Sequence, residues 1–126
     1  MARRSSSEFA LRSACPISAA LDVVGDRWTL LILRDLLLGK TKYNEFLGAD
    51  EGIPTNILAD RLLRMQTLGL IEKTAYQDNP PRYAYAPTKK GRDLKFVVGA
   101  LAMWSKEHVP GVKINDTLKQ LVMAGR

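Results

Sequence analysis

The feature that most constrains the fold of this chain is a polar helix that runs directly into a β-hairpin. Residues 52–69 read GIPTNILADRLLRMQTLG, in which Leu58, Leu62 and Met65 recur at the spacing of one helical face and Gly69 is a typical helix stop. The segments LIEKTAY, QDNPPR and YAYAP then read as a strand, a turn and a second strand. The two prolines predict a stiff, polar loop tip rather than a tight two-residue turn. Such a helix is either a solvated surface element or a surface that recognises a partner.

Three helical patterns precede this unit. Pro16 suits a first helical turn, and the apolar residues that follow it keep helical spacing as far as Gly25. Asp26 is a good N-cap for RWTLLILRDLLLG, which is apolar on most faces and predicts a buried central helix. The segment TKYNEFLGA predicts a short third helix that Thr41 caps.

Two more helical patterns follow the hairpin. Thr88 is expected to cap one long helix, KKGRDLKFVVGALAMWSKEH, and NDTLKQLVMAG predicts a short final helix capped by Asn115 or Asp116. These segments carry a wide apolar stripe that is a candidate dimerisation surface: Leu94, Val97, Val98, Leu101, Trp104, Leu118 and Leu121. One small domain has limited core to cover so much apolar helix, so the stripe predicts a homodimer. For Trp104, filling the chain's own core is the open alternative.

The composition favours a globular chain with a polyanionic partner. A length of 126 residues predicts one domain, and the net charge of +6 makes nucleic acid the commonest kind of partner, although charge alone also fits an acidic membrane surface or a protein that is merely basic. The longest apolar run, TLLILRDLLL, is far below the ~20 residues of a membrane span, and no secretory signal is visible. A lone Cys15 fits a reducing cytoplasm, where we expect the protein to be.

The order of these elements predicts the fold. Three helices, the second and third closely joined, followed by a two-stranded hairpin, is the order of a winged helix-turn-helix. We therefore predict a mainly α (α+β) fold with a two-stranded wing and a long C-terminal dimerisation helix. Residues 1–14 are expected to form a flexible or dimer-arm N-terminus and residues 15–126 the winged helix-turn-helix domain, with 88–126 also forming the dimerisation helices.

In such a fold the helix of residues 54–65 is the recognition helix, and its N-terminal residues read base edges in the major groove of double-stranded DNA. Thr55, Asn56 and Arg61 are the candidates for base readout. The candidates for phosphate or minor-groove contacts are Thr41, Lys42, Arg64 and Arg82, with Arg3 and Arg4 as a basic arm. Because Arg61 and Arg64 lie off the apolar stripe, we expect them to be free. The bland alternative is a solvated helix with an Asp60–Arg64 pair.

The chain also resembles a known family on several quoted segments. CPISAALDVVGDRWTLLIL, GKTKYNEF, GIPTNILADRLLRMQTLGLIEK and PPRYAYAPTKKG, with the later Trp104, are similar to the pattern of HxlR-type regulators in the MarR-like winged-helix group. The resemblance covers about residues 15–108 and implies a dimeric bacterial transcription factor that contacts DNA with helix termini and the wing. Two-fold symmetry predicts a palindromic operator with half-sites ~10 base pairs, or a multiple of that, apart. Met65-Gln66 departs from the family's usual Leu-Glu, and Pro87 replaces its usual Leu, which is expected to shorten the second wing strand.

The resemblance also suggests signals that would control DNA binding. In some members of that family a cysteine at the place of Cys15 senses oxidants or electrophiles, which requires a lowered thiol pKa. The alternative is a small buried hydrophobe. A small-molecule effector between the wing domain and the dimerisation helices is a second open possibility, and the sequence names none.

The sequence contains no recognisable catalytic motif. There is no Gly-rich phosphate loop, no Gly-x-Ser-x-Gly elbow and no His-Glu-x-x-His segment, and a single His108 with a single Cys makes no metal set. We therefore expect no cofactor, no metal, no membrane partner and no catalysis. The rival to DNA binding is a protein-interaction adaptor that uses the same fold without nucleic acid.

Overall fold

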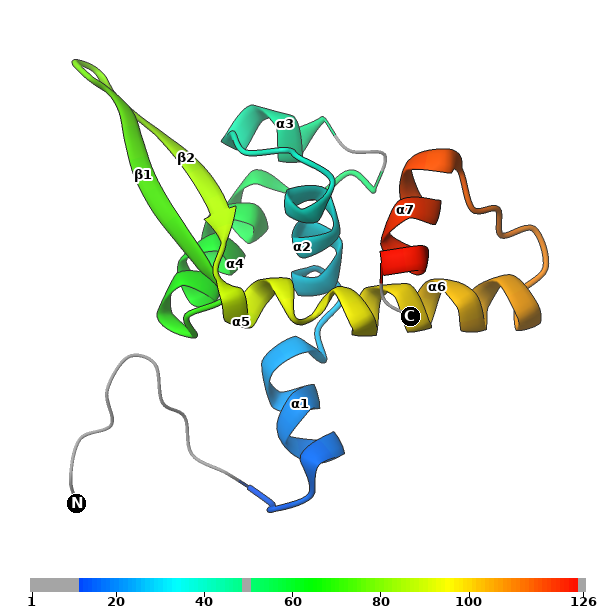
Figure 1. Cartoon of the computed structure of the whole chain (residues 1–126). Helices are drawn as coiled ribbons and strands as arrows, with labels where there is room; N and C mark the ends of the chain where they lie inside the picture. The colour runs from blue at the N-terminus through cyan, green and yellow to red at the C-terminus, as the bar shows by residue number, and fades with distance from the viewer. Residues whose placement is uncertain (1–11, 49–50, 125–126) are drawn as a thin grey trace.

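The computed structural model describes residues 12–48 and 51–124, and it has the predicted winged helix-turn-helix fold (Figure 1). The elements follow one another as α1 (Pro16–Val24), α2 (Thr29–Leu37), α3 (Tyr43–Leu47), α4 (Thr55–Thr67), β1 (Ile71–Asp78), β2 (Pro81–Pro87), α5 (Lys89–Arg92), α6 (Lys95–His108) and α7 (Asp116–Ala124). Most of the expected N-terminal arm, including Arg3 and Arg4, lies outside the described residues. In the described ranges, no helix combines the length and the apolar character needed to cross a bilayer.

The core lies where α2, α3 and α4 meet. The predicted inward face of α4 is confirmed, since Leu58, Leu62 and Met65 are fully buried or nearly so. They join Leu33 of α2 and Phe46 of α3 in one apolar cluster. Burial of five such side chains is the main force that holds the three helices together. Gly69 then takes a positive φ of 75°, which ends α4 and turns the chain into β1.

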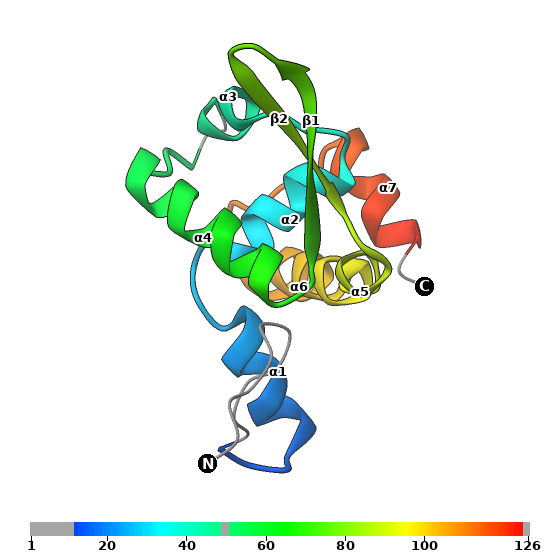
Figure 2. The same ribbon diagram turned by 90° about the vertical axis from the view of Figure 1, so that its left-hand side faces the viewer.

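The wing is a two-stranded antiparallel sheet that projects from the body (Figure 2). Two predictions about its prolines are wrong. Asp78 pairs with Pro81, so the strands are joined by a two-residue turn rather than by a longer loop tip. Pro87 does not shorten β2, because it is the last strand residue and still pairs with Ile71. Pro81 and Pro87 are the first and last residues of β2, and at a strand end a missing N–H disturbs the hydrogen bonds between the strands least.

The long helix expected after Thr88 is divided into α5 and α6. Thr88 caps α5 as predicted, since its Oγ1 accepts a hydrogen bond from the Gly91 N–H at 3.1 Å. Gly91 lies so close to the preceding chain that a Cβ there would be 2.1 Å from the Leu70 carbonyl oxygen. The chain turns again at Asp93 and Leu94 before α6 begins. Because of this break, α5 packs against the base of the wing while α6 runs under α2 (Figure 1).

The predicted cap of α3 is wrong by one residue. The helix begins at Tyr43 with Lys42 as its N-cap, and the Glu45 carboxylate accepts hydrogen bonds from the backbone N–H groups of Thr41 and Lys42. These bonds lower the pKa of Glu45, first through the Thr41 N–H and then through the Lys42 N–H. The capping acid comes from inside the helix, as in a capping box.

Two helices lie at the edges of the body. The last helix, α7, packs on α6 across Gly99, where a Cβ would lie 3.3 Å from the Leu121 carbonyl oxygen, and the Leu118 N–H is capped by Asn115 as expected. The first helix, α1, projects away from the body, and only its last turn is covered (Figure 1).

Candidate nucleic-acid interface

The N-terminus of α4 presents two polar side chains to solvent. Thr55 and Asn56 are the first two residues of the helix and both are exposed, with Pro54 in an extended conformation before them. Neither side chain hydrogen-bonds to any other residue that the structure describes. The backbone here is fixed from α3, because the Tyr43 hydroxyl donates a hydrogen bond to the Thr55 carbonyl oxygen at 2.9 Å. A rigid helix end with unused amide and hydroxyl groups can match donors and acceptors on base edges.

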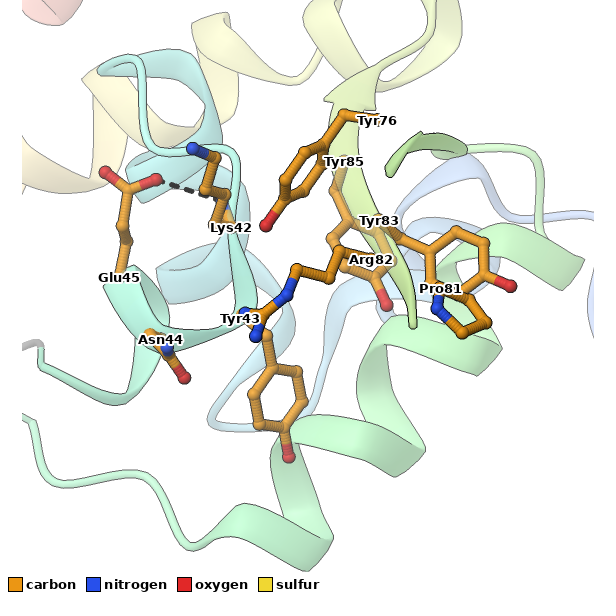
Figure 3. Close-up of a pocket in the computed structure, with 9 residues that line it drawn as sticks. All are labelled: Lys42, Tyr43, Asn44, Glu45, Tyr76, Pro81, Arg82, Tyr83 and Tyr85. Atoms are coloured by element: carbon orange, nitrogen blue, oxygen red, sulfur yellow. Dashed lines mark hydrogen bonds between the residues drawn. The ribbon is translucent and has the colours of Figure 1, made fainter. Parts of the chain in front are cut away.

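A groove of about 360 Å³ lies between α3 and the wing, beside this helix end (Figure 3). Its lining holds all four tyrosines of the chain. The lining residues are Lys42, Tyr43, Asn44, Glu45, Tyr76, Pro81, Arg82, Tyr83 and Tyr85. In the close-up, the Lys42 and Arg82 side chains both lie near the Tyr76 ring, so both predicted backbone-contacting cations border the same groove.

Two lysines beside the groove, Lys42 and Lys73, lie over aromatic rings. The Lys42 Nζ lies 4.8 Å from the centre of the Tyr76 ring, and the Lys73 Nζ lies 4.3 Å from the centre of the Tyr83 ring. A bulge in the strand pairing between Ala75 and Gln77 leaves Tyr76 without a cross-strand partner. Such a bulge re-aims a side chain. Among the described residues, neither Lys42 nor Arg82 forms an ion pair, so both charges are available to phosphate.

Tyr76, Tyr83 and Lys73 were not among the site residues predicted from the sequence. The signal for the tyrosines is the alternation of Tyr83 and Tyr85 along β2, which places their two rings on one face of the hairpin. The bulge that redirects Tyr76 has no glycine or proline to mark it in the sequence, so its position could not be predicted.

Arg61 and Arg64 do not have the free side chains that we expected. Both are half-buried and bonded to the body of the chain, on the side of α4 that faces the junction of α1 and α2. The Arg61 Nε donates to the Asp26 carboxylate at 2.8 Å, and the two Arg64 Nη groups donate to the backbone oxygens of Asp22 and Val23. The structure therefore groups Thr55, Asn56, Lys42 and Arg82 at one end of the molecule and these two arginines elsewhere.

Asp26 is the centre of that second cluster. Partial burial raises its pKa, but hydrogen bonds from the Thr29 hydroxyl, from Arg61 and from the backbone N–H groups of Trp28 and Thr29 outweigh burial and hold the pKa at about 2. The helix α2 begins at Thr29 with Trp28 as its N-cap residue, so the predicted N-cap at Asp26 is wrong by two residues. The Asp26 carboxylate still accepts hydrogen bonds from the N–H groups of Trp28 and Thr29 at the start of α2, and it also bonds Arg61 of α4.

Thr41 contributes its backbone rather than its side chain. It is half-buried, and its carbonyl oxygen accepts a hydrogen bond from the Tyr85 N–H at 2.7 Å. This bond ties the loop before α3 to β2, and the adjacent bridge between Lys42 and Ala84 extends the contact. Thr41 therefore helps to hold the loop before α3 against β2.

Cys15 is exposed, so the expectation of a small buried hydrophobe is wrong. It precedes α1, and the backbone N–H groups of Ser18 and then Ile17 lower the pKa of its thiol. Helix N-termini stabilise thiolates in this way. The surface position and the lowered pKa are the two properties that a reactive cysteine needs.

The predicted dimerisation stripe is divided between two surfaces. Val98 and Leu121 are buried inside the chain, where α6 and α7 pack together. Leu101 and Trp104 remain 50% and 60% exposed, and Val97 is also exposed. Leu94 and Leu118 are half-buried. An outer face of α6 is therefore apolar and uncovered in the single chain.

Within residues 12–48 and 51–124, no three His, Cys, Asp or Glu side chains come together in a way that could hold a metal ion. His108 instead lies against Trp104, with the ring centres 5.2 Å apart.

The chain is similar to known transcriptional regulators over most of its length. The model of the HxlR-like helix-turn-helix family matches residues 23–113. An uncharacterised HTH-type transcriptional regulator of Mycobacterium tuberculosis is 38% identical over 94 residues, which are 75% of this chain and 59% of that protein. The chain thus spans less than two thirds of that relative's length. The uncharacterised regulator YdeP of Bacillus subtilis is 30% identical over 94 residues, 75% of this chain and 73% of YdeP.

Solved structures have the same fold. The redox regulator HypR in its reduced form superimposes with a TM-score of 0.70 at 26% identity, covering 75% of this chain and 94% of HypR. A proposed transcriptional regulator of the MarR family from Porphyromonas gingivalis gives a TM-score of 0.69 at 27% identity, covering 81% of this chain and 100% of that one. With a family model that covers most of the chain and a winged helix-turn-helix fold, this chain belongs to the HxlR-like helix-turn-helix family of transcriptional regulators.

Proposed function

We propose that this protein regulates transcription by binding a palindromic DNA operator as a homodimer, with the N-terminus of α4 in the major groove and the wing beside it. The observation that carries the proposal is the pair of exposed side chains of Thr55 and Asn56, flanked by the cations Lys42 and Arg82, since none of these four side chains bonds to or forms an ion pair with another residue that the structure describes. The first pair can specify bases and the second can neutralise phosphates. Thr41 acts through its backbone, and Arg61 and Arg64 position the helix.

The apolar surfaces of α1 and α6 support the homodimer. Ile17 and Leu21 on α1 are 71% and 57% exposed, and they share a groove with Val97 of α6. Leu101 and Trp104 follow Val97 at helical spacing, so the apolar face extends along α6. An exposed apolar face of this extent is stable in water when a second copy covers it. Two-fold symmetry then brings two α4 helices to two half-sites of the operator.

Selection of bound sequences from a random duplex pool tests the proposal. We expect an enriched inverted repeat, and an affinity that falls steeply and linearly on a log–log plot as salt rises. An enriched sequence without inverted symmetry would contradict the dimer. No duplex binding at low salt, together with co-purification of another protein chain, would favour the adaptor alternative.

A redox input is a second candidate, favoured by the exposure and lowered pKa of Cys15. Hydrogen peroxide would oxidise the Cys15 thiols of two chains to one disulfide, and the peroxide would be reduced to two molecules of water. We expect peroxide to release the unaltered protein from DNA and to leave Cys15→Ser bound, as measured by fluorescence anisotropy of a labelled duplex. Equal release of both proteins would exclude sensing through this thiol.

A further inference from the structure

The recognition helix is fastened to α1 by one arginine. The Arg64 Nη2 donates a hydrogen bond to the Asp22 carbonyl oxygen at 2.7 Å, and its Nη1 donates to the Val23 carbonyl oxygen at 2.9 Å. These oxygens belong to the last turn of α1, whose carbonyls have no partner within the helix. The preceding one, of Leu21, is satisfied by the Gly25 N–H at 2.8 Å. Arg64 therefore completes the C-terminal end of α1 from another helix.

A second bond lies one turn away on the same face of α4. Arg61 bonds to Asp26, and Asp26 accepts the N–H groups of Trp28 and Thr29 that begin α2. Residues three apart share a helix face, so Arg61 and Arg64 hold α4 on both sides of the junction between α1 and α2. The helix that presents Asn56 is thus bonded to the end of α1 and to the start of α2.

Most of α1 is poorly packed against the body of the chain. Val23 and Val24 at its C-terminal end are packed against the body, whereas Ile17 and Leu21 are exposed to solvent. A largely apolar groove of about 470 Å³ runs between α1 and the start of α6, with Leu94 among its lining residues. Because both walls are apolar and continue the uncovered face of α6, the occupant that fits this groove is a second copy of the chain.

The spacing along α4 makes Arg64 a pivot. Asn56 lies eight residues before Arg64, which is about 12 Å along a rigid helix at 1.5 Å per residue, so a rotation of about 5° at Arg64 moves Asn56 by about 1 Å. A shift of about 1 Å is enough to lose a hydrogen bond to a base edge, because such bonds occupy a range of about 0.5 Å.

From these contacts we propose that Arg64 is a positioning residue that couples the dimer surface to DNA reading. A second copy seated on α1 fixes the direction of that helix, and the two Arg64 bonds pass this direction to α4 and so to Asn56. The coupling is reciprocal, so operator binding also orders α1. This inference rests on the proposed function above and deepens it.

A label on a cysteine placed at the exposed Ala14 (Ala14→Cys), two residues before α1, in a chain that also carries Cys15→Ser, reports on that helix without modifying the candidate sensor. Each protein carries a fluorescent maleimide at this position and is saturated with the duplex that the unaltered chain selects. The test variants are Arg64→Gln, which removes the guanidinium, and Arg64→Lys, which keeps the charge but cannot hold two carbonyls in a planar fork. The matched control is Arg92→Gln on α5, since Arg92 also donates to one carbonyl oxygen, that of Pro87, at 2.9 Å.

We expect DNA to lower the quenching of the label by acrylamide in the unaltered protein and in Arg92→Gln, and to leave this quenching unchanged in both Arg64 variants. Affinity for the selected duplex is expected to fall on the order of tenfold in both Arg64 variants, while affinity for non-specific duplex stays within about twofold. The slope of log affinity against log salt is expected to be the same as in the unaltered chain, because Arg64 neutralises no phosphate.

Several outcomes would overturn the coupling and leave DNA binding intact. One is a label response that persists in both Arg64 variants, and another is a DNA-bound unaltered protein whose label does not respond. A third is normal affinity in Arg64→Lys with a salt slope reduced by about one in Arg64→Gln, which is the behaviour of a phosphate contact. If Arg64→Gln does not unfold cooperatively, the Lys variant alone decides. An unaltered chain that binds no duplex overturns the proposed function and the coupling together.

Discussion

At the scale of single residues, the polar side chains of α4 differ in whether they have hydrogen-bond partners within the chain. Arg61 and Arg64 face a carboxylate and two carbonyl oxygens of the same chain, whereas Asn56 faces solvent. A guanidinium that already has protein acceptors must lose them to reach DNA, and a charged hydrogen bond of this kind contributes about 1.5–3 kcal/mol. Specific recognition is therefore assigned to the side chains without partners.

Substitution of Asn56 and of Lys42 separates base reading from phosphate binding. Asn56→Ala is expected to relax specificity at one operator position, with a loss of about 1–3 kcal/mol there, because one base-edge contact disappears. Lys42→Ala is expected to weaken binding to all sequences alike and to reduce the salt slope by about one. Competition binding with single-base operator variants measures both effects, and an identical pattern in the two variants would contradict the division of roles.

Asp26 gives the protein a pH-dependent contribution to stability. Its pKa is about 2 in the folded chain against an ordinary value of 3.8, so the unfolded state binds its proton first as the pH falls. The stabilisation is fully present above about pH 4 and is lost as the pH falls through about 2, and it amounts to on the order of 1–2 kcal/mol after allowance for solvent screening. Asp26→Asn is expected to remove it at neutral pH.

Urea unfolding at about pH 7, 4 and 2 measures this contribution. Asp60→Asn is the matched control, because Asp60 also bonds Arg61 but is largely exposed. The assignment fails if the two variants have the same free energy of unfolding at every pH.

At the scale of elements, the seat of α5 on the wing depends on a glycine without a side chain. Gly91→Ala would place a Cβ at 2.1 Å from the Leu70 oxygen, on a rigid backbone that cannot give way. We expect a loss of about 1–3 kcal/mol in the free energy of unfolding, as for overpacked cores. Gly48→Ala is the control, since its nearest neighbours would be 3.7 Å away, and it should unfold like the unaltered chain in thermal denaturation.

Local patterns predicted these elements well and their junctions poorly. The face of α4 followed from the spacing of Leu58, Leu62 and Met65, because helical period and burial are linked within one segment. The break between α5 and α6 did not follow from the sequence, because no glycine or proline marks it at Asp93 and Leu94. The two-residue turn at Asn79 and Pro80 was missed for a similar reason, since cross-strand register rather than local composition decides where the turn begins.

In the candidate site, too, local sequence patterns predicted some residues and missed contacts between residues far apart in the sequence. Thr55, Asn56, Lys42 and Arg82 were found because each stands at an identifiable end of an element. The bonds of Arg61 and Arg64 were missed because their acceptors, Asp26 and the end of α1, are about 40 residues away in sequence, and no local pattern encodes such a pair.

At the scale of the whole molecule, one apolar face crosses from α1 to α6 and stays uncovered in the single chain. Leu101 lies on it and is half exposed. Leu101→Asp is expected to give a monomer with unchanged helix content, because a carboxylate buried without a partner at the interface is costly and two-fold symmetry places two of them there.

Sedimentation velocity with far-ultraviolet circular dichroism measures the effect of Leu101→Asp. Leu63→Asp is the control, since Leu63 is an exposed leucine on α4, away from this face. A dimer in both variants would place the interface elsewhere, and a monomeric unaltered protein at micromolar concentration would remove the dimer altogether.

The weak attachment of α1 also makes its order depend on protein concentration. Its turns up to Leu21 add little to the core, so opening them does not require the rest of the chain to unfold. A helix whose apolar face is covered only on association is stabilised by mass action, and its folded fraction rises as chains become more abundant. In a cell, the amount of this protein would therefore set how much of it has a complete N-terminal helix, while the core stays folded at any dilution.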